Sequence, residues 1–254
     1  MTAMQSIIEL KDVHKGFGHQ QVLRGLNLSL ERDRVSVIIG GSGGGKSVLL
    51  KHIIGLFKPD KGQVVVDGQD IVPLTERQMT PVRRQFGLLF QEGALFDSMT
   101  VAENVAFPLR EHTKKNMREI MEIVEHKLTS VGLSGVGYKM PSELSGGMRK
   151  RVGLARALAL DPKIVLFDEP TSGLDPVMAA AINELILSTQ NDFNTTCVVI
   201  SHDIAATMFI AHTIFMLYKG QIIAQGTPEE IKNSDDPVVR QFIRGEAKGP
   251  IKIA

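Results

Sequence analysis

The sequence predicts an α/β fold in which buried parallel strands alternate with helices. Three short runs are almost wholly apolar, as are strands buried on both faces of a parallel sheet, and they lie at residues 35–39, 164–167 and 198–200. Helical patterns fall between these runs. Two earlier segments, 7–13 and 21–30, read as strands with Gly16 and Gly18 between them, which predicts an antiparallel start to the chain.

A helical insertion is expected in the middle of the chain. Apolar residues recur there at intervals of three and four, which makes one helix face apolar: Met117, Ile120, Met121, Val124, Leu128 and Val131. We expect a helical subdomain within about 92–158 and interpret its methionine-rich stripe as core. A second hairpin is expected at 214–218 and 221–224. The main domain is expected to span 1–245, and the tail that follows it, 246–254, to be a surface extension.

The composition is that of a globular protein with balanced charge. Lys and Arg total 29 and Asp and Glu total 28 among 254 residues, so the net charge is +1 and gives no electrostatic reason to expect nucleic acid as a partner. The single cysteine, Cys197, cannot form an internal disulfide, which fits a reducing compartment, and it is expected to be a buried apolar side chain. No signal peptide is visible and no apolar run reaches the ~18 residues of a membrane span. Any membrane role is therefore expected to act through a partner.

A phosphate-binding loop is predicted directly after the first buried strand. Residues 40–47 read Gly-Gly-Ser-Gly-Gly-Gly-Lys-Ser and open a helix. The glycines let backbone N–H groups point at phosphate oxygens, and the helix N-terminus adds its positive dipole end. In this pattern the lysine reaches the β- and γ-phosphates and the last serine offers its hydroxyl to Mg²⁺. The predicted ligands are ATP and Mg²⁺, and the loop residues are Gly40, Gly41, Ser42, Gly43, Gly44, Gly45, Lys46 and Ser47.

Two acidic residues follow the buried strand at 164–167. Asp168 and Glu169 stand at its carboxyl end, where ligands bind in open α/β sheets. Asp168 is predicted to hold Mg²⁺ through water, and Glu169 to polarise the attacking water as a general base. A solvated turn is the alternative, and the phosphate loop upstream favours the acidic site.

The segment 144–148 reads Leu-Ser-Gly-Gly-Met and resembles the signature motif of the ABC ATPases. The phosphate loop, this segment and the acidic pair come in the order typical of that family. The resemblance implies that Ser145 and the backbone of Gly146 and Gly147 bind the γ-phosphate of an ATP held by a second subunit. The family usually has Gln where this chain has Met148. Because backbone groups and Ser145 carry the contact, we expect function to survive this difference.

Smaller matches to the family supply further site residues. The resemblance assigns Gln91 to Mg²⁺ and the attacking water, and His202 to the γ-phosphate. Asp175 ends a Ser-Gly-Leu-Asp segment that resembles the loop crossing the dimer interface. Phe17 occupies the place of the aromatic residue that stacks on adenine. Tyr is more frequent at that place, and simple packing is the alternative for Phe17.

The resemblance covers about residues 7–245 and implies both fold and assembly. It implies the P-loop NTPase fold, with a RecA-like α/β core, an antiparallel β subdomain and an inserted helical subdomain. One chain holds only half of each composite site. A homodimer that hydrolyses two ATP molecules between its subunits is therefore implied.

The stretch that follows Gln91 is expected to meet a membrane protein. In the family a groove here receives a short helix of a permease, and Leu95, Phe96 and Met99 are expected to line it, with ordinary core as the alternative. The sequence of residues 91–96, 108–113 and 140–148 is similar to that of the Mla-type branch of Gram-negative bacteria, which shares the methionine at 148. That resemblance implies phospholipid transport between the inner and outer membranes for outer-membrane lipid asymmetry. It also implies an integral membrane permease, an MCE-domain substrate-binding protein, a STAS-domain accessory subunit and a peripheral place on the cytoplasmic side of the inner membrane.

Three other readings stay open at this point. They are the ATPase of another ABC importer or exporter, a soluble ABC enzyme that acts on nucleic acid, and a regulatory module that scarcely hydrolyses ATP. The balanced charge and the apolar stretch around Phe96 favour transport over the second. The intact Glu169 and His202 favour it over the third. The interval between Lys46 and Ser145 is also too short for the long coiled coils of chromosome and repair ATPases.

Overall fold

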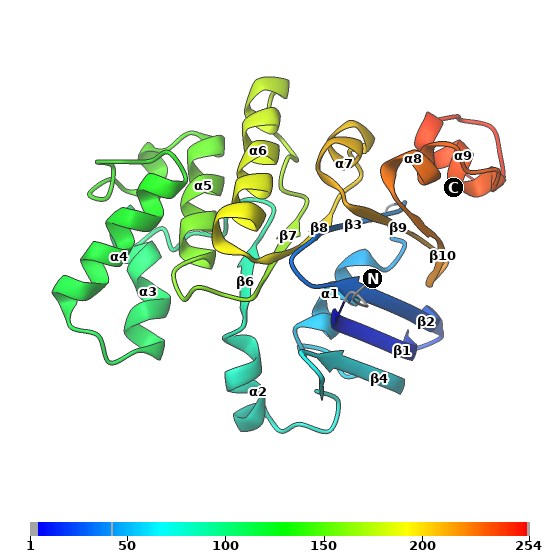
Figure 1. The fold of residues 1–254 in the computed structure, drawn as a ribbon, viewed down its shortest axis with the longest axis horizontal. Coiled ribbons are helices and arrows are strands. Elements are labelled where there is room, and N and C mark those ends of the chain that lie inside the picture. The colour runs from blue at the N-terminus through cyan, green and yellow to red at the C-terminus, as the bar shows by residue number, and fades with distance from the viewer. Residues whose placement is uncertain (1–4, 42, 253–254) are drawn as a thin grey trace. The chain divides into compact units, whose positions relative to one another are not determined.

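A computed structural model describes residues 5–41 and 43–252 (Figure 1). The chain divides into two compact units. The terminal unit comprises residues 1–83 and 198–254, and the middle unit comprises residues 84–197. Within the described residues, no helix combines the length and the hydropathy that crossing a bilayer requires.

The terminal unit begins with an antiparallel sheet. Strands β1 (Ser6–Phe17) and β2 (Gln20–Glu31) pair antiparallel, which confirms the predicted antiparallel start. Strands β4 (Lys61–Val66) and β5 (Gln69–Asp70) complete the order β2-β1-β4-β5. Alternate apolar residues of β2, at positions 26, 28 and 30, are buried while the residues between them, at 27 and 29, are exposed, because side chains of a strand point to opposite faces in turn.

A second sheet of the terminal unit carries the buried strands. Strand β3 (Val35–Ile39) is buried at all five residues and runs parallel to β9 (Thr213–Tyr218), which pairs antiparallel with β10 (Gln221–Gly226). These bounds confirm the predicted strand at 35–39 and the predicted hairpin. Strand β8 (Thr196–Ile200) crosses the division between the units, and beyond it the amide of Ser201 donates to the carbonyl of Ile38 at 3.2 Å.

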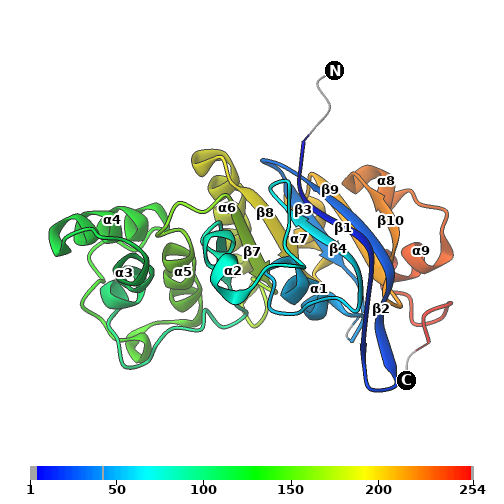
Figure 2. The ribbon, with the colours of Figure 1, turned by 90° about the horizontal axis from the view of Figure 1, so that it is seen from below.

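Short helices complete the terminal unit. They are α1 (Lys46–Ile53), α2 (Glu76–Arg83), α7 (Ile204–Ile210), α8 (Pro228–Lys232) and α9 (Pro237–Arg244). Figure 2 shows α8 and α9 beside β10. Residues 246–250 of the tail are exposed, yet they fold back on α9, where the buried Gln241 donates to the carbonyls of Glu246 and Ile251 and accepts from the Ile251 amide at 2.7 Å.

The middle unit contains a parallel strand pair and a group of helices. Strands β6 (Phe86–Leu89) and β7 (Ile164–Asp168) are parallel neighbours, as expected for buried α/β strands. The helices are α3 (Val101–His112), α4 (Met117–Ser130), the 3₁₀ turn η1 (Pro141–Glu143), α5 (Gly146–Ala157) and α6 (Pro176–Phe193). Helices α3, α4 and α5 contact one another and lie side by side in Figures 1 and 2.

The apolar stripe of α4 is only partly core. Ile120, Val124 and Leu128 are buried, as the periodicity predicts. Met117 and Met121 are 57% and 43% exposed, so their interpretation as core is wrong. Met117 is the first residue of the helix and Met121 lies at the edge of the stripe, and the periodicity that predicts a helix face does not say how wide a part of that face a neighbouring element covers.

A buried histidine on α1 makes the stability of the terminal unit sensitive to acid. His52 is fully buried, its Nδ1 lies 2.7 Å from the Val48 carbonyl, and its Nε2 has no hydrogen-bond partner among the described residues. Burial lowers the pKa of His52 below its ordinary value of 6.5, with a further contribution from Lys15, while the Val48 hydrogen bond and Asp60 oppose the shift. The neutral ring is therefore the form that the fold favours.

The sign of the pH effect follows from this lowered pKa. The contribution of His52 to the free energy of unfolding is present above pH 6.5 and is lost as the pH falls through the folded-state pKa, because the unfolded chain takes up the proton first. In urea unfolding between pH 7.5 and pH 5.5, we expect His52→Gln to lose less stability than the parent chain. The matched control is His19→Gln, which alters an exposed histidine. Equal losses in the parent and His52→Gln would contradict this assignment.

Candidate functional site

The predicted phosphate loop connects β3 to α1 and closes over its own lysine. Lys46 is 9% exposed, and its Nζ donates to the carbonyls of Gly40 at 2.8 Å and Gly41 at 3.0 Å. The amide of Gly44 donates to the Gly41 carbonyl at 3.1 Å, which tightens the curl. Gly40 has a φ of 155°, and a Cβ there would lie 2.3 Å from the carbonyl oxygen of Leu217, so the position requires glycine. Ser42 lies outside the described residues.

The loop leaves the beginning of α1 open to an anion. Gly45 precedes the helix in a left-handed conformation, and no side chain caps the helix at this position. Space is open above Gly41 and Gly43, where an added Cβ would meet no atom within 4 Å, and Ser47 in the first turn is exposed. Backbone N–H groups, the helix dipole and the Lys46 ammonium therefore converge on one place, an arrangement that fits the phosphates of a nucleotide.

His202 lies beside this loop in the terminal unit. It is exposed, two residues after the end of β8, and it lines a cavity of about 480 Å³ together with Gly40, Gly41 and the end of α9 at 242–245. The structure thus brings His202 and the start of the phosphate loop together. The neighbourhood of α9 is a feature that the sequence did not predict, because nearly forty positions separate it from His202.

Phe17 ends β1 with part of its ring uncovered. The ring is 43% exposed and packs at 5.5 Å between centroids against Phe57, while the Lys15 ammonium lies 5.6 Å from its centroid. One side of the ring is thus supported and the remainder is available to a planar group. An aromatic ring supported on one side can stack on adenine, and this role of Phe17 stays a prediction.

The acidic pair stands at the end of β7 in the middle unit. Asp168 is the last residue of the strand and is half-buried. Glu169 follows with a φ of 50°, a left-handed conformation that is unfavourable for a residue with a side chain and that gathers at functional sites. Farther along the loop, Asp175 caps α6 by accepting from the amides of Val177 and Met178, both at 3.0 Å.

The signature segment forms the start of α5. Ser145 is exposed and caps the helix, since its Oγ accepts from the amide of Met148 at 3.2 Å. A Cβ on Gly147 would lie 2.1 Å from Cε of Met178, so this glycine permits close packing against α6. Met148 contributes its backbone amide to the cap, and that contact does not depend on whether methionine or glutamine stands there. The helix N-terminus is open at Ser145, which is exposed, and at Gly146, which is half-buried, so a phosphate can approach it from that side.

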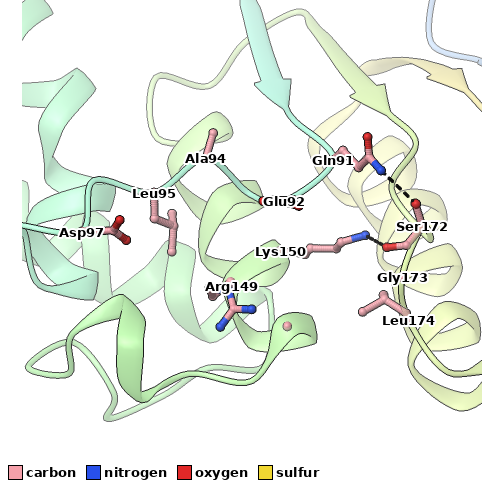
Figure 3. A pocket seen from close by; sticks show the side chains of 11 residues that line it. Gln91, Glu92, Ala94, Leu95, Asp97, Arg149, Lys150, Ser172, Gly173 and Leu174 are labelled. Atoms are coloured by element: carbon pink, nitrogen blue, oxygen red, sulfur yellow. Dashed lines mark hydrogen bonds between the residues drawn. The ribbon is translucent and has the colours of Figure 1, made fainter.

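Gln91 belongs to a polar cluster at the edge of a second cavity, which Figure 3 shows from close by. Its Nε2 donates to Oγ of Ser172 at 3.0 Å. The buried Lys150 reaches the same loop from α5 and donates to the carbonyls of Pro170 at 2.7 Å and Ser172 at 2.6 Å. The cavity has a volume of about 420 Å³, and Glu92, Gly146 and Leu174 are among the residues that line it.

Lys150 is a residue that the sequence analysis missed. The available signal was its spacing, because positions 147, 150 and 154 fall on one helix face and Gly147 and Leu154 are apolar members of that face. Burial lowers the pKa of Lys150, and the negative charges of Glu92 and Glu169 oppose the shift. Lys150 is therefore a charged side chain on the buried face of α5.

The stretch after Gln91 contributes to an apolar groove. Phe96 is 41% exposed, packs 4.9 Å from Phe107 between ring centroids, and has the Arg156 guanidinium 5.7 Å above its ring. Arg156 also donates to the carbonyls of Gly93 and Ala94, both at 2.8 Å. The groove has a volume of about 330 Å³ and is lined by Phe86, Gly87, Leu88, Phe90, Ala94, Phe96, Phe107, Pro108, Arg156, Ala157 and Leu160.

The prediction for this groove is only partly correct. Phe96 lines it, but Leu95 lines the polar cavity beside Gln91 instead. Met99 is half-buried and does not line the groove. The groove's aromatic residues at 86, 90 and 107 were not predicted.

A bound Mg²⁺ would have few ligands from the protein. Among residues 5–41 and 43–252, no group of three or more His, Cys, Asp and Glu side chains could hold a metal ion. Mg²⁺ is commonly bound by one or two protein ligands together with substrate phosphates and water. The hydroxyl of Ser47 in the terminal unit, and the carboxylate of Asp168 and the amide oxygen of Gln91 in the middle unit, are each an oxygen donor of the type that Mg²⁺ takes.

Comparisons with known proteins identify the family. A family model described as ABC transporter matches residues 23–172. The chain is 46% identical over 244 residues to the probable ribonucleotide transport ATP-binding protein mkl of Mycobacterium leprae, covering 96% of this chain and 70% of that relative. It is 43% identical over 248 residues to the intermembrane phospholipid transport system ATP-binding protein MlaF of Haemophilus influenzae, covering 98% of this chain and 94% of the relative.

A solved structure supports the same assignment. The dimeric post-hydrolysis state of the ATP-binding cassette MJ0796, bound to ADP and Pi, superposes with a TM-score of 0.79 at 32% identity. The match covers 87% of this chain and 98% of that chain. The predicted P-loop NTPase fold with its antiparallel β subdomain is thereby confirmed. The chain belongs to the ABC transporter family, and it is an ATPase of the type that resembles the Mla ATP-binding proteins.

Proposed function

We propose that this ATPase drives phospholipid transport between the inner and outer membranes and so maintains outer-membrane lipid asymmetry. The observation that supports ATP hydrolysis is the geometry of the phosphate loop. The Lys46 ammonium, the open space above Gly41 and Gly43, and the uncapped start of α1 converge on one place. The transport half is supported by the similarity to relatives named for intermembrane phospholipid transport, at 43% identity across 98% of the chain.

Each protomer is proposed to contribute half of two composite ATP sites. Lys46 and the backbone of 40–47 bind the phosphates of one ATP, and Phe17 stacks on its adenine. Ser145 with Gly146 and Gly147 caps the γ-phosphate of the ATP held by the partner subunit, and Asp175 lies at the interface between the two. The exposed cap residue Ser145 supports this role, because a phosphate presented by a partner subunit can approach the N-terminal amides of α5 there.

The chemistry is proposed to follow from the groups around the γ-phosphate. Mg²⁺, when bound through Ser47, Asp168 and Gln91, would neutralise charge on the β- and γ-phosphates. Glu169 takes the proton of the attacking water as general base, and His202 contacts the γ-phosphate. Lys46 holds the phosphates in line, and hydrolysis then removes the group that joins the two protomers. The dimer closes on ATP and reopens after hydrolysis.

The chain is proposed to sit on the cytoplasmic side of the inner membrane, held there by an integral membrane permease. The groove around Phe96 supports this, since its aromatic lining and its volume of about 330 Å³ suit the apolar face of a short helix. An MCE-domain substrate-binding protein and a STAS-domain subunit complete the proposed assembly. Their support is the similarity to the Mla-type relatives.

Replacing Phe96 by Asp is expected to release the membrane partner. The substitution places a charge in the apolar groove. We therefore expect recovery of an integral membrane protein with the tagged chain to fall at least tenfold, which corresponds to a loss of about 1.4 kcal/mol of binding free energy. Recovery is measured by affinity purification from detergent-solubilised membranes. Tyr138→Asp is the matched control, because Tyr138 is 76% exposed and does not line the groove. Undiminished recovery with Phe96→Asp would exclude this groove as the docking site.

The cargo is tested on the intact assembly. Mass spectrometry of the complex purified from membranes is expected to identify a permease, an MCE-domain protein and bound phospholipid. A complex that contains these proteins and moves labelled phospholipid between vesicle populations only with ATP supports the proposal. ATP-dependent movement of labelled ribonucleotides into vesicles, in place of phospholipid, would favour the other transport class named among the relatives, ribonucleotide transport, and would overturn the lipid assignment.

A further inference from the structure

We propose that Lys150 is a positioning residue that couples the two ATP sites of the dimer to each other. It does so by fastening the signature helix α5 to the loop between Glu169 and Asp175. This inference rests on the proposed function, in which each protomer contributes to both ATP sites. It adds a residue that none of the predicted site motifs contains.

The contacts of Lys150 are directed and specific. Its Nζ donates to the carbonyls of Pro170 at 2.7 Å and Ser172 at 2.6 Å, so one ammonium joins α5 to two points of a three-residue stretch. Both partners are backbone atoms, and the contact therefore fixes the path of the loop itself. Figure 3 shows the Lys150 side chain extending from α5 to the Ser172 carbonyl.

Burial makes this contact costly to lose. Lys150 is 4% exposed, and a buried ammonium requires hydrogen-bond acceptors because it has lost its water. The carboxylates of Glu92 and Glu169 act on it as well, which compensates part of its charge within the same unit. A lysine held in this way cannot swing to solvent as an exposed lysine does, so α5 and the loop move together.

A second side chain reaches the same residue from another loop. Gln91 donates to Oγ of Ser172 at 3.0 Å, while Lys150 holds the Ser172 carbonyl. Ser172 is therefore the point where the loop after β6, the signature helix and the loop after β7 are joined. Figure 3 shows Gln91 and Lys150 both directed at this residue.

Lys150 connects two segments that, in the proposed dimer, act on different ATP molecules. Glu169 acts on the ATP held by its own protomer, whereas Ser145 caps the ATP held by the partner. Ser145 lies five positions before Lys150 on one helix, about 7.5 Å along its axis. A shift of the loop at Glu169 on hydrolysis is thus passed through Lys150 to the cap on the other nucleotide. Lys150 makes the two sites cooperative.

The test compares three full-length variants in the same assay. Lys150→Met removes the donor, Lys150→Gln keeps a neutral donor on a chain of similar length to methionine, and Lys115→Met is the control at an exposed lysine. ATP hydrolysis is measured against ATP concentration, and the affinity for ATP is measured separately with a fluorescent ATP analogue. Circular dichroism checks the folding of each variant.

We expect Lys150→Met to lower the Hill coefficient from about 2 toward 1 and to reduce kcat about tenfold, with an ATP affinity within about twofold of the parent chain. The Hill coefficient and kcat of Lys150→Gln are expected to lie between those of the parent chain and those of Lys150→Met. If Lys150→Met does not fold, Lys150→Gln alone still decides, since a parental Hill coefficient in that variant overturns the proposal. Loss of ATP affinity in parallel with kcat also overturns it, because that pattern reports general damage. A parent chain that neither dimerises on ATP nor hydrolyses it cooperatively overturns the proposed function, and the coupling with it.

Discussion

Glu169→Gln is expected to lower ATP turnover by roughly 10²- to 10⁴-fold, the range that a general base contributes, while ATP binding stays intact. The amide cannot take a proton from water, but it keeps the size and hydrogen-bonding capacity of the carboxylate. Glu169 stands in a left-handed turn immediately after β7, so a substitution of equal size leaves that backbone undisturbed. Bound ATP would then persist between the protomers, and closed dimers would accumulate.

Two measurements check this result together. Release of inorganic phosphate gives the turnover, and light scattering after size exclusion with ATP and Mg²⁺ gives the fraction of dimers. Glu184→Gln is the matched control, because it makes the same chemical change at an exposed position of α6. A Glu169→Gln chain that remains monomeric and hydrolyses ATP at the parental rate would refute the assignment of the base.

Lys46→Ala is expected to weaken ATP binding by at least tenfold, because charge-assisted hydrogen bonds contribute about 1.5–3 kcal/mol each. The Lys46 ammonium lies inside the loop, bonded to the carbonyls of Gly40 and Gly41, and it can exchange these acceptors for phosphate oxygens without leaving the site. Its removal takes away the positive charge that the phosphates require. Calorimetric titration with ATP and Mg²⁺ measures the loss.

A matched lysine on the same helix provides the control for this experiment. Lys51 lies one turn further along α1 and is exposed, with its ammonium 5.2 Å from the ring of Phe57. We expect Lys51→Ala to bind ATP as the parent chain does. If Lys46→Ala bound ATP with undiminished affinity, residues 40–47 would not be the phosphate site.

Local patterns predicted much of the fold. The strand at 35–39 was predicted at the bounds that β3 has, because an almost wholly apolar run between Arg34 and Gly40 leaves little choice of limits. Helix α3 was not predicted as a separate element. It carries Pro108 inside it, a residue that usually argues against a helix interior, and tertiary packing against α4 and α5 outweighs that local preference.

The candidate site, like the fold, has parts that the sequence predicts and parts that it does not. Motifs placed the phosphate loop, the acidic pair and the signature segment, since each is a run of adjacent residues whose chemistry depends on local backbone geometry. The hydrogen bonds of Gln91 and Lys150 could not be predicted, because they join residues 81 and 22 positions away in the sequence. No spacing rule specifies such contacts, which depend on how β6, β7 and α5 pack in the middle unit. The catalytic roles of the site residues stay predictions.

The shared nucleotide site is tested most directly by mixing two damaged chains. Both carry Glu169→Gln so that bound ATP is retained, and one also carries Lys46→Ala while the other carries Ser145→Arg. Each chain alone forms dimers in which both composite sites are damaged, whereas a mixed dimer has one site with an intact Lys46 and an intact Ser145 facing it. The account predicts that the mixture retains ATP through gel filtration while neither chain alone does. A Ser145→Arg chain that retains ATP by itself, so that mixing adds nothing, would show that a single protomer holds its nucleotide unaided, in contradiction to this account.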